Sequence, residues 1–210
     1  RDPRLKYTVA YNGMDWYDLN DKGEYVKKFT LNVTSGSDQA GTANGSPTGF
    51  YTRKYFDPDH GKNLEMWTNF IMMRYADVLL MKAEALIWTK GEGDAEAKQL
   101  LNRIRKRARL EENSTATKAE LKNQRRCELA FEFMPSRHLD MVRWGDAKEA
   151  YAEPTRRVNS HWDSETQTVV IDEPSDYDQG RTFDPVINQV FPIPVTAFNG
   201  TVNLKQNIGY

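Results

Sequence analysis

Between residues 70 and 150, apolar residues recur at intervals of three and four, which is the spacing of one face of an α-helix. The first stripe comprises Tyr75, Ala76, Leu79, Leu80, Ala83, Leu86 and Ile87, and the second comprises Ala97, Leu100, Leu101, Ile104 and Ala108. Gly91-Glu92-Gly93 interrupts the pattern, and Asp94 is a good N-cap for a new helix. The sequence therefore predicts two helices that pack antiparallel, because the turn between them is short.

Two further helices are expected in the same stretch. Thr117 and Glu120 have the spacing of a capping box, which marks a helix start. This helix is predicted to run to Phe133, where Pro135 ends or kinks it. A fourth helix is expected to stop at Gly145.

The segments on either side alternate apolar and polar residues between turn signals, a pattern typical of short β-strands. Asn12-Gly13 is a strong hairpin signal, and the Ser-, Gly-, Thr- and Asn-rich stretch 34–49 predicts a mobile loop. The prolines on both sides of Ile193 require an extended backbone there. The expected strands are 7–11, 25–29, 50–55, 168–171 and 186–193. Together with the helices, they predict a mainly α-helical chain with short β-hairpins and long loops, an α+β fold.

Composition limits the range of functions. The 210 residues fit one large domain or two small ones, and 29 Lys and Arg balance 30 Asp and Glu. A net charge of −1 gives no bulk attraction for nucleic acid, so we expect no nucleic-acid partner. A mean hydropathy of −0.76 excludes an integral membrane protein. The single cysteine excludes an internal disulfide and a multi-cysteine metal site. The chain opens on Arg1 without a targeting segment, so we expect a processed product or a fragment.

No catalytic motif stands out in the chain. His60, His138 and His161 fit neither HExxH nor HxH, and the glycine-rich phosphate loops and G-x-S-x-G are missing. Cys127 follows two arginines that could lower its thiol pKa, but no histidine lies nearby, so a packed small side chain is the better interpretation. We therefore expect no catalytic residues, no metal and no cofactor.

Two acidic stretches carry part of a calcium-loop pattern. Residues 57–63 begin like such a loop but lack the glycine at the sixth position and the closing glutamate. Asp176, Asp178 and Gly180 form an equally incomplete pattern. A solvated acidic turn is the better interpretation of each.

Charged residues also cluster on the predicted helices. One group could present a basic face to phosphate, but the balanced net charge favours a solvated helix face. It comprises Arg103, Arg105, Lys106, Arg107 and Arg109. A second group flanks the junction of the third and fourth helices and predicts structural ion pairs between them. It comprises Glu128, Glu132, Arg137, Asp140 and Arg143.

The tryptophans are the best candidates for ligand contact. Trp16, Trp67 and Trp162 lie beside Asp, Asn, Thr or Ser, and such a ring can pack on a sugar while its neighbours hydrogen-bond the hydroxyls. For each of them, covering a small core under a loop is an equally good interpretation. Trp88 and Trp144 follow apolar helix positions and are predicted to be core residues.

Taken together, the motifs resemble the SusD/RagB family over essentially the whole chain. RYADVLLMKAEA at 74–85 resembles one family helix, and RRCELAFE with the later LDMVRWG resembles the family signature. The matching segments are 2–5, 49–55, 74–85, 101–108, 125–132, 137–145, 191–194 and 206–210. The sequence departs from the family pattern at 133–136 and at Ile208.

This resemblance implies the C-terminal part of a SusD-like, tetratricopeptide-related helical fold, with the N-terminal helical repeats absent from this chain. Residues 1–56 would form hairpins and loops, 70–150 a helical core and 151–210 a loop-rich C-terminal segment. The resemblance also implies non-catalytic binding of an oligosaccharide or polysaccharide at the bacterial cell surface. Delivery would be to a SusC-like TonB-dependent outer-membrane transporter, with a lipid anchor on an N-terminal cysteine outside this chain.

Three alternatives remain open. A peptide-binding, RagB-like member of the same uptake system would show backbone-pairing edges in its cleft. A fragment of a glycan hydrolase would show two facing carboxylates. A helical scaffold for protein contacts would show a large apolar patch.

Overall fold

A computed structural model gives the fold in two compact units, which are described separately. The first comprises Arg1–Met134 and Arg157–Pro174, and the second comprises Pro135–Arg156 and Ser175–Tyr210. The structure describes residues 2–11, 13–31, 48–56, 68–132, 136–157, 160–163, 165–166, 168–200 and 203–210.

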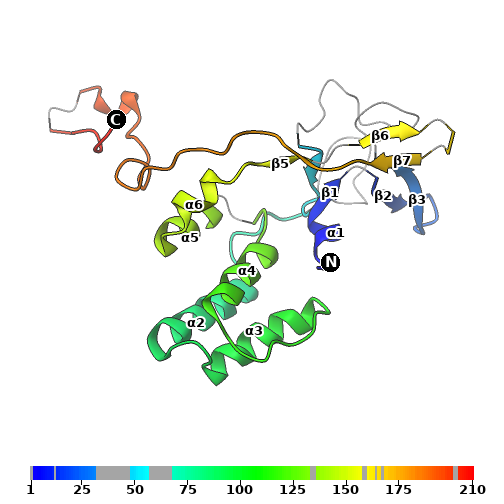
Figure 1. Ribbon diagram of the computed structural model, residues 1–210, viewed down its shortest axis with the longest axis horizontal. Coiled ribbons are helices and arrows are strands. Elements are labelled where there is room, and N and C mark those ends of the chain that lie inside the picture. The colour runs from blue at the N-terminus through cyan, green and yellow to red at the C-terminus, as the bar shows by residue number, and fades with distance from the viewer. Residues whose placement is uncertain are drawn as a thin grey trace. The chain divides into compact units, whose positions relative to one another are not determined.

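Three helices form the core of the first unit (Figure 1). They are α2 (Tyr75–Lys90), α3 (Ala95–Arg107) and α4 (Lys118–Glu128). Their buried side chains are Leu79, Leu80, Ala83, Ile87, Ala97, Leu101, Ile104, Ala116, Leu121 and Leu129. These include most of the two predicted apolar stripes, so helical periodicity correctly identified this core. Trp88 is different: 44% of it is exposed, and its prediction as a core residue was wrong.

The helix ends follow the predicted capping chemistry. Gly91, with a φ of 98°, ends α2, and Asp94 caps α3 by accepting a 2.9 Å hydrogen bond from the amide of Ala97. Thr117 caps α4 by accepting a hydrogen bond from the amide of Glu120 at 3.1 Å. However, α4 stops at Glu128, short of the predicted end, because the chain turns back at Phe131, which has a φ of 63°.

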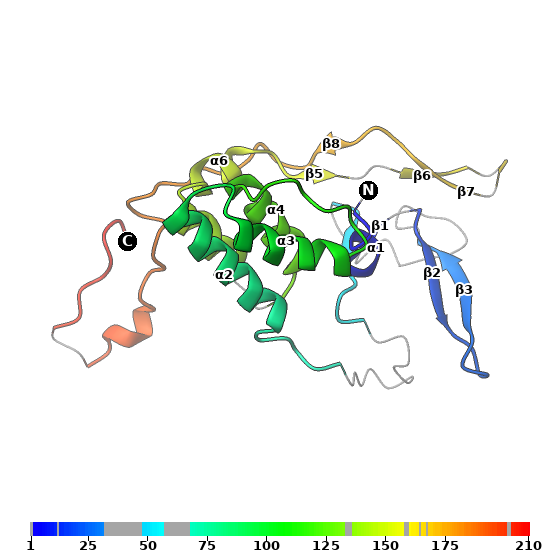
Figure 2. The same ribbon diagram turned by 90° about the horizontal axis from the view of Figure 1, so that it is seen from below.

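Among its described residues, the first unit also contains three antiparallel strand pairs. They are β1 (Val9–Tyr11) with β4 (Phe50–Thr52), β2 (Asp15–Leu19) with β3 (Tyr25–Thr30), and β6 (Ser160–Asp163) with β7 (Thr168–Ile171). The β2–β3 hairpin is clearly seen in Figure 2. The strands predicted at 25–29 and 168–171 are confirmed.

Two expectations for the N-terminal segment were wrong. Residues 5–8 form a helical turn, α1 (Leu5–Thr8), in which the hydroxyl of Thr8 donates to the carbonyl of Arg4 at 2.9 Å, so the first strand begins later than predicted. In addition, β1 pairs with β4 and not with the strand that follows it, so the Asn12-Gly13 signal does not close a hairpin between neighbours in sequence. Most of the predicted loop 34–49 lies outside the described residues.

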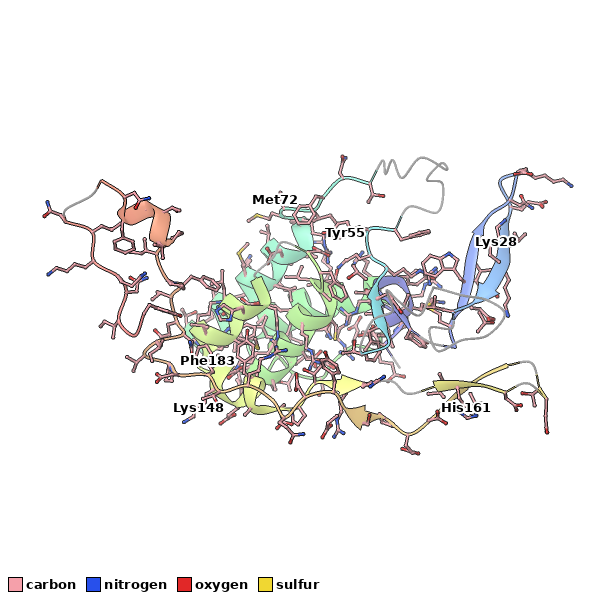
Figure 3. All side chains as sticks on the ribbon, turned by 90° about the horizontal axis from the view of Figure 1, so that it is seen from above. Lys28, Tyr55, Met72, Lys148, His161 and Phe183 are labelled. Atoms are coloured by element: carbon pink, nitrogen blue, oxygen red, sulfur yellow. The ribbon has the colours of Figure 1, made fainter. Side chains whose placement is uncertain are left out.

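The second unit is built on α5 (Ser136–Trp144) and α6 (Ala147–Ala152). Met141, Ala147 and Phe183 form its small core. The ring of Phe183, labelled in Figure 3, stacks on Tyr151 with centroids 5.7 Å apart. The fourth predicted helix and its stop at Gly145 are therefore confirmed, whereas α6 was not predicted. The same unit holds a short 3₁₀ helix, η2 (Val195–Phe198), and β8 (Ser175–Asp176), which pairs with β5 (Arg156–Arg157).

The strand predicted over 186–193 does not form. Asp184 instead accepts a hydrogen bond from the amide of Val186 and another from the amide of Asn188, both at 2.7 Å, and closes a turn. The hydrogen bonds that form this turn at Asp184-Pro185 therefore replace the strand that the following apolar residues predicted. Beyond the turn, Gln206 takes the place of a partner strand, because its side chain accepts from the amide of Ile193 at 2.8 Å and donates to its carbonyl at 2.9 Å.

The Gln206 clamp can be tested by substitution. We expect Gln206→Ala to leave both backbone groups of Ile193 without this partner, at a cost of about 1 kcal/mol for each hydrogen bond. Hydrogen exchange at the Ile193 amide, followed by NMR, should accelerate about tenfold or more. Gln189→Ala, at an exposed position nearby, is the control and should leave that rate unchanged. An unchanged rate in Gln206→Ala would show that the clamp does not hold the segment.

Candidate functional site

The first unit contains a cavity of about 570 Å³ with a strongly charged wall. The wall includes residues from α1, from the turn after β4, from the residue before α2, and from the ends of α3 and α4. Figure 2 shows α1 beside the end of α3. Its charged side chains are Arg4, Lys6, Lys54, Arg74, Arg107, Arg109, Glu128 and Glu132. The ring of Tyr7, which is 65% exposed, also lines it.

Within this wall, Glu128 is the centre of a charge cluster. The other members of the cluster are Arg4, Lys54, Arg74, Arg107 and Glu132. The side chain of Glu128 has no exposed surface, and its carboxylate accepts hydrogen bonds from Arg74 at 2.7 Å, from Arg4 at 3.0 Å and from Arg107. Burial by itself would raise the pKa of Glu128, but the hydrogen bonds from Arg74 and Arg4 outweigh it and hold that pKa below its usual range. The carboxylate is therefore ionised and its acceptor capacity is used within the protein.

Glu132 extends the cluster through Arg74 and Lys54. The Nε of Arg74 donates to Glu132 at 2.7 Å, while its Nη2 donates to the carbonyl of Glu128 at 2.6 Å. The ammonium of Lys54 pairs with Glu132 and donates to the carbonyls of Glu128 and Ala130 at 2.9 and 3.0 Å, which uses all three of its hydrogens. Burial lowers the pKa of Lys54 despite this pairing.

The ion pairs of these residues differ from the predicted pairs between the third and fourth helices. Glu128 and Glu132 bind cations from segments far away in sequence, whereas the Asp140 carboxylate lies 2.7 Å from the guanidinium of Arg143 on its own helix. The residues that sequence reasoning missed are Arg4, Lys54 and Arg74. All three lie in segments that carried the family resemblance, and this was the available signal for them.

Among the three tryptophans predicted to contact ligand, the structure describes a side chain only for Trp16. This ring is half-buried, with the Arg53 guanidinium 4.9 Å from its centroid and the edge-to-face ring of Phe56 at 4.6 Å. Trp67 lies outside the described residues. Trp162 stands opposite Val169 in the β6–β7 pair, and its side chain is also outside the described part.

The turn after β4 connects Trp16 to the cavity. Arg53 and Phe56 contact the Trp16 ring, and Lys54 between them enters the charge cluster. Tyr55, which is labelled in Figure 3, stacks on Phe70 with centroids 5.4 Å apart. Consecutive residues of one turn thus join an aromatic surface to a cationic wall.

The other candidate groups are occupied by structural contacts. Burial raises the pKa of the Cys127 thiol, so it is not an activated nucleophile. Asp178 accepts hydrogen bonds from the amide and hydroxyl of Thr155 and from the amide of Gly180, at 2.8, 2.9 and 3.0 Å. Asp176 pairs with Arg156 at 2.8 Å. Within the described ranges no group of three metal-ligating side chains is present, and residues 57–63 lie outside these ranges. None of the described helices could cross a membrane.

Comparison with known proteins identifies relatives along the whole chain. The sequence profile of the SusD family matches residues 1–210. The SusD-like protein P2 of Formosa agariphila is 42% identical over 96 residues, which cover 40% of this chain and 17% of that protein.

Solved structures agree with this match. A SusD-like protein from Bacteroides fragilis superposes with a TM-score of 0.74 at 26% identity, covering 100% of this chain and 39% of its own. A laminarin-binding SusD-like protein has a TM-score of 0.56, also at 26% identity, and covers 100% of this chain and 35% of its own. The chain therefore spans well under half the length of these relatives, and the predicted helical α+β fold is confirmed.

The charge cluster predicts a large loss of stability in Glu128→Gln. Removing the carboxylate leaves the Arg4 and Arg74 guanidinium groups partly buried without their main counter-charge, which typically costs about 3–5 kcal/mol. Urea denaturation measures the change. Glu96→Gln, which breaks the exposed pair between Lys82 and Glu96, is the matched control and should lower stability far less. Equal losses in the two variants would contradict a central role for Glu128.

The lowered pKa of Glu128 also predicts an acid limb in the stability profile. Because its pKa is lower in the folded chain than in the unfolded chain, its contribution is fully present above about pH 4.3 and is lost as the pH falls through the folded value. The free energy of unfolding, measured between pH 7 and pH 3, should fall more steeply below that point in the parent chain than in Glu128→Gln. Parallel profiles would show that Glu128 is not the group responsible.

Proposed function

Because the chain belongs to the SusD family, we propose that it binds glycans without turnover and serves a SusC-like TonB-dependent transporter at the outer membrane of a bacterium. The observation that carries this proposal is the cavity of the first unit, which is lined by Tyr7 and by guanidinium and ammonium groups. The turn that supplies its Lys54 also supplies Arg53 and Phe56, which contact the ring of Trp16. The solved relative that binds laminarin supports a saccharide as the ligand class.

This surface offers the two kinds of contact that saccharides need. Aromatic rings pack against the apolar C–H face of a sugar, and charged N–H groups donate to its hydroxyls. Tyr7 is open to solvent, and Trp16 carries the Arg53 guanidinium beside its ring. We propose Trp16, together with Trp67 and Trp162, as residues that contact the ligand.

The charge cluster favours binding over hydrolysis. A glycosidase needs one carboxyl group that stays protonated near neutral pH and a second carboxylate that acts on the sugar. Glu128 has a lowered pKa, and the Glu132 carboxylate is engaged by Arg74 and Lys54. The two carboxylates of the cavity therefore hold the fold together and are poorly suited to acid–base chemistry.

Attachment to the membrane is part of the proposal for the whole protein. The chain covers 35–39% of the solved relatives described above, and we propose that the lipidated cysteine belongs to a part of the whole protein outside this chain. Copurification of the full-length protein with the transporter encoded beside it tests the partnership. Recovery of the protein without any transporter, under conditions that preserve outer-membrane complexes, would contradict this part of the proposal.

Glycan binding predicts a specific loss in Trp16→Ala. Affinity electrophoresis of the full-length protein against a panel of neutral and charged glycans identifies a ligand. The variant should then bind it about tenfold more weakly, since an aromatic contact contributes about 0.5–1.5 kcal/mol beyond its buried area.

Trp88→Ala is the matched control for this experiment. Trp88 is also partly exposed and also has a cation at its ring, with the Lys118 ammonium 4.9 Å from the centroid. It lies near the end of α2, however, whereas Trp16 contacts Arg53 and Phe56 on either side of the cavity residue Lys54. The Trp88→Ala variant should bind the glycan with the affinity of the parent protein. Equal effects in the two variants would remove Trp16 from the site, and binding to peptides but to no glycan would favour a RagB-like function.

A further inference from the structure

The cavity wall carries more positive than negative charge. Six cationic side chains and two carboxylates line it, and Asp2 adds a third carboxylate behind Arg4 at 2.6 Å, which leaves three positive charges unmatched. Glu128 and Glu132 already have their partners within the charge cluster. In a concave site with low-dielectric walls, such an excess creates a potential that attracts anions.

Two of the cations stand outside the charge cluster. Among the described residues, neither Lys6 nor Arg109 forms an ion pair, and both side chains are exposed at the cavity wall. Lys6 lies with its ammonium 5.0 Å from the centroid of the Tyr7 ring. These two cations are available to a ligand, whereas Arg4, Lys54 and Arg74 are occupied by structural contacts.

The backbone at Arg109 is an independent sign that this position matters. Its φ of 57° lies in the left-handed region, which disfavours any residue with a side chain. The amide of Arg109 donates to the carbonyl of Lys106 at 3.0 Å, and that of Leu110 to Arg105 at 2.9 Å, so this is the position after α3 that glycine usually occupies. An arginine in a backbone conformation that favours glycine points to a role for its side chain.

We propose that this cavity binds an anionic group, either a carboxylate or a sulfate ester, carried by the oligosaccharide ligand. Lys6 and Arg109 are the residues that recognise the charge, and the exposed ring of Tyr7 packs against the sugar that carries it. A guanidinium suits either anion because its N–H groups can bond two oxygens at once. The cavity volume lies within the roughly 300–1,000 Å³ typical of small-ligand sites. This inference rests on the proposed glycan-binding function and specifies its ligand class.

The experiment compares glycans that differ only in charge. The full-length protein is run in affinity gels that contain polygalacturonate or its fully methyl-esterified form, and κ-carrageenan or its desulfated form. We expect at least a tenfold preference for the charged member of one pair, and we expect this preference to shrink as salt is raised from 50 to 500 mM. In Lys6→Gln and Arg109→Gln the preference should fall several-fold.

Controls separate charge recognition from general effects of charge or folding. Lys28→Gln, on the β2–β3 hairpin labelled in Figure 3, and Lys106→Gln, on the exposed side of α3, remove the same charge away from the cavity wall and should bind like the parent. Arg109→Gly relieves the left-handed strain, so it should keep or raise the melting temperature while it loses the preference. A loss of preference in this variant cannot come from unfolding.

The remaining outcomes each overturn the inference. Equal binding to both members of each pair would refute charge recognition but leave glycan binding intact. Preference for hexa-aspartate over every glycan would identify the cavity as a docking site for an acidic polypeptide. Unchanged preference in both Lys6→Gln and Arg109→Gln would place charge recognition elsewhere. Binding to no glycan, neutral or charged, would also refute the proposed function.

Discussion

The buried carboxylate of Glu128 is the constraint on which the first unit depends. A charge without access to water is tolerated only with close partners of opposite sign, and these partners come from the N-terminal segment, from the residue before α2 and from the end of α3. Lys54, in the turn after β4, also donates a hydrogen bond to the backbone carbonyl of Glu128. The cavity wall is formed by these same segments, so its geometry is set by the need to neutralise one carboxylate.

The sequence predicts those parts of the structure that are determined by interactions between residues close together in the chain. Helical periodicity and the caps at Asp94 and Thr117 act within a few residues, so the core of α2, α3 and α4 could be predicted. Arg4 and Glu128 are separated by 124 positions, and no local pattern indicates that they meet. The failed strand at 186–193 has a further cause, because hydrogen bonds of Asp184 compete with an apolar pattern that looks equally good for a strand.

The candidate site shows the same division. A tryptophan beside polar residues is a local signal, and it drew attention to Trp16, but the neighbouring Arg53 guanidinium belongs to a strand end 37 positions away. The segments that carry the family resemblance place Arg4, Lys54, Arg74 and Glu128 in the charge cluster, where they hold the fold. The segments 2–5 and 101–108 end one residue before Lys6 and Arg109. The two exposed cations of the cavity wall thus lie immediately beside segments that supply the charge cluster.

Arg107 links the scaffold to the open part of the cavity. Its guanidinium bonds the fully buried Glu128, yet 64% of its side chain remains exposed, so an anion in the cavity can share it without leaving Glu128 unpaired, because Arg4 and Arg74 remain bound. Any ligand that binds only the folded unit stabilises it in proportion to the logarithm of its concentration. Binding and folding therefore draw on the same electrostatic cluster. A charged ligand would reinforce a wall that by itself carries more positive charge than its carboxylates can balance.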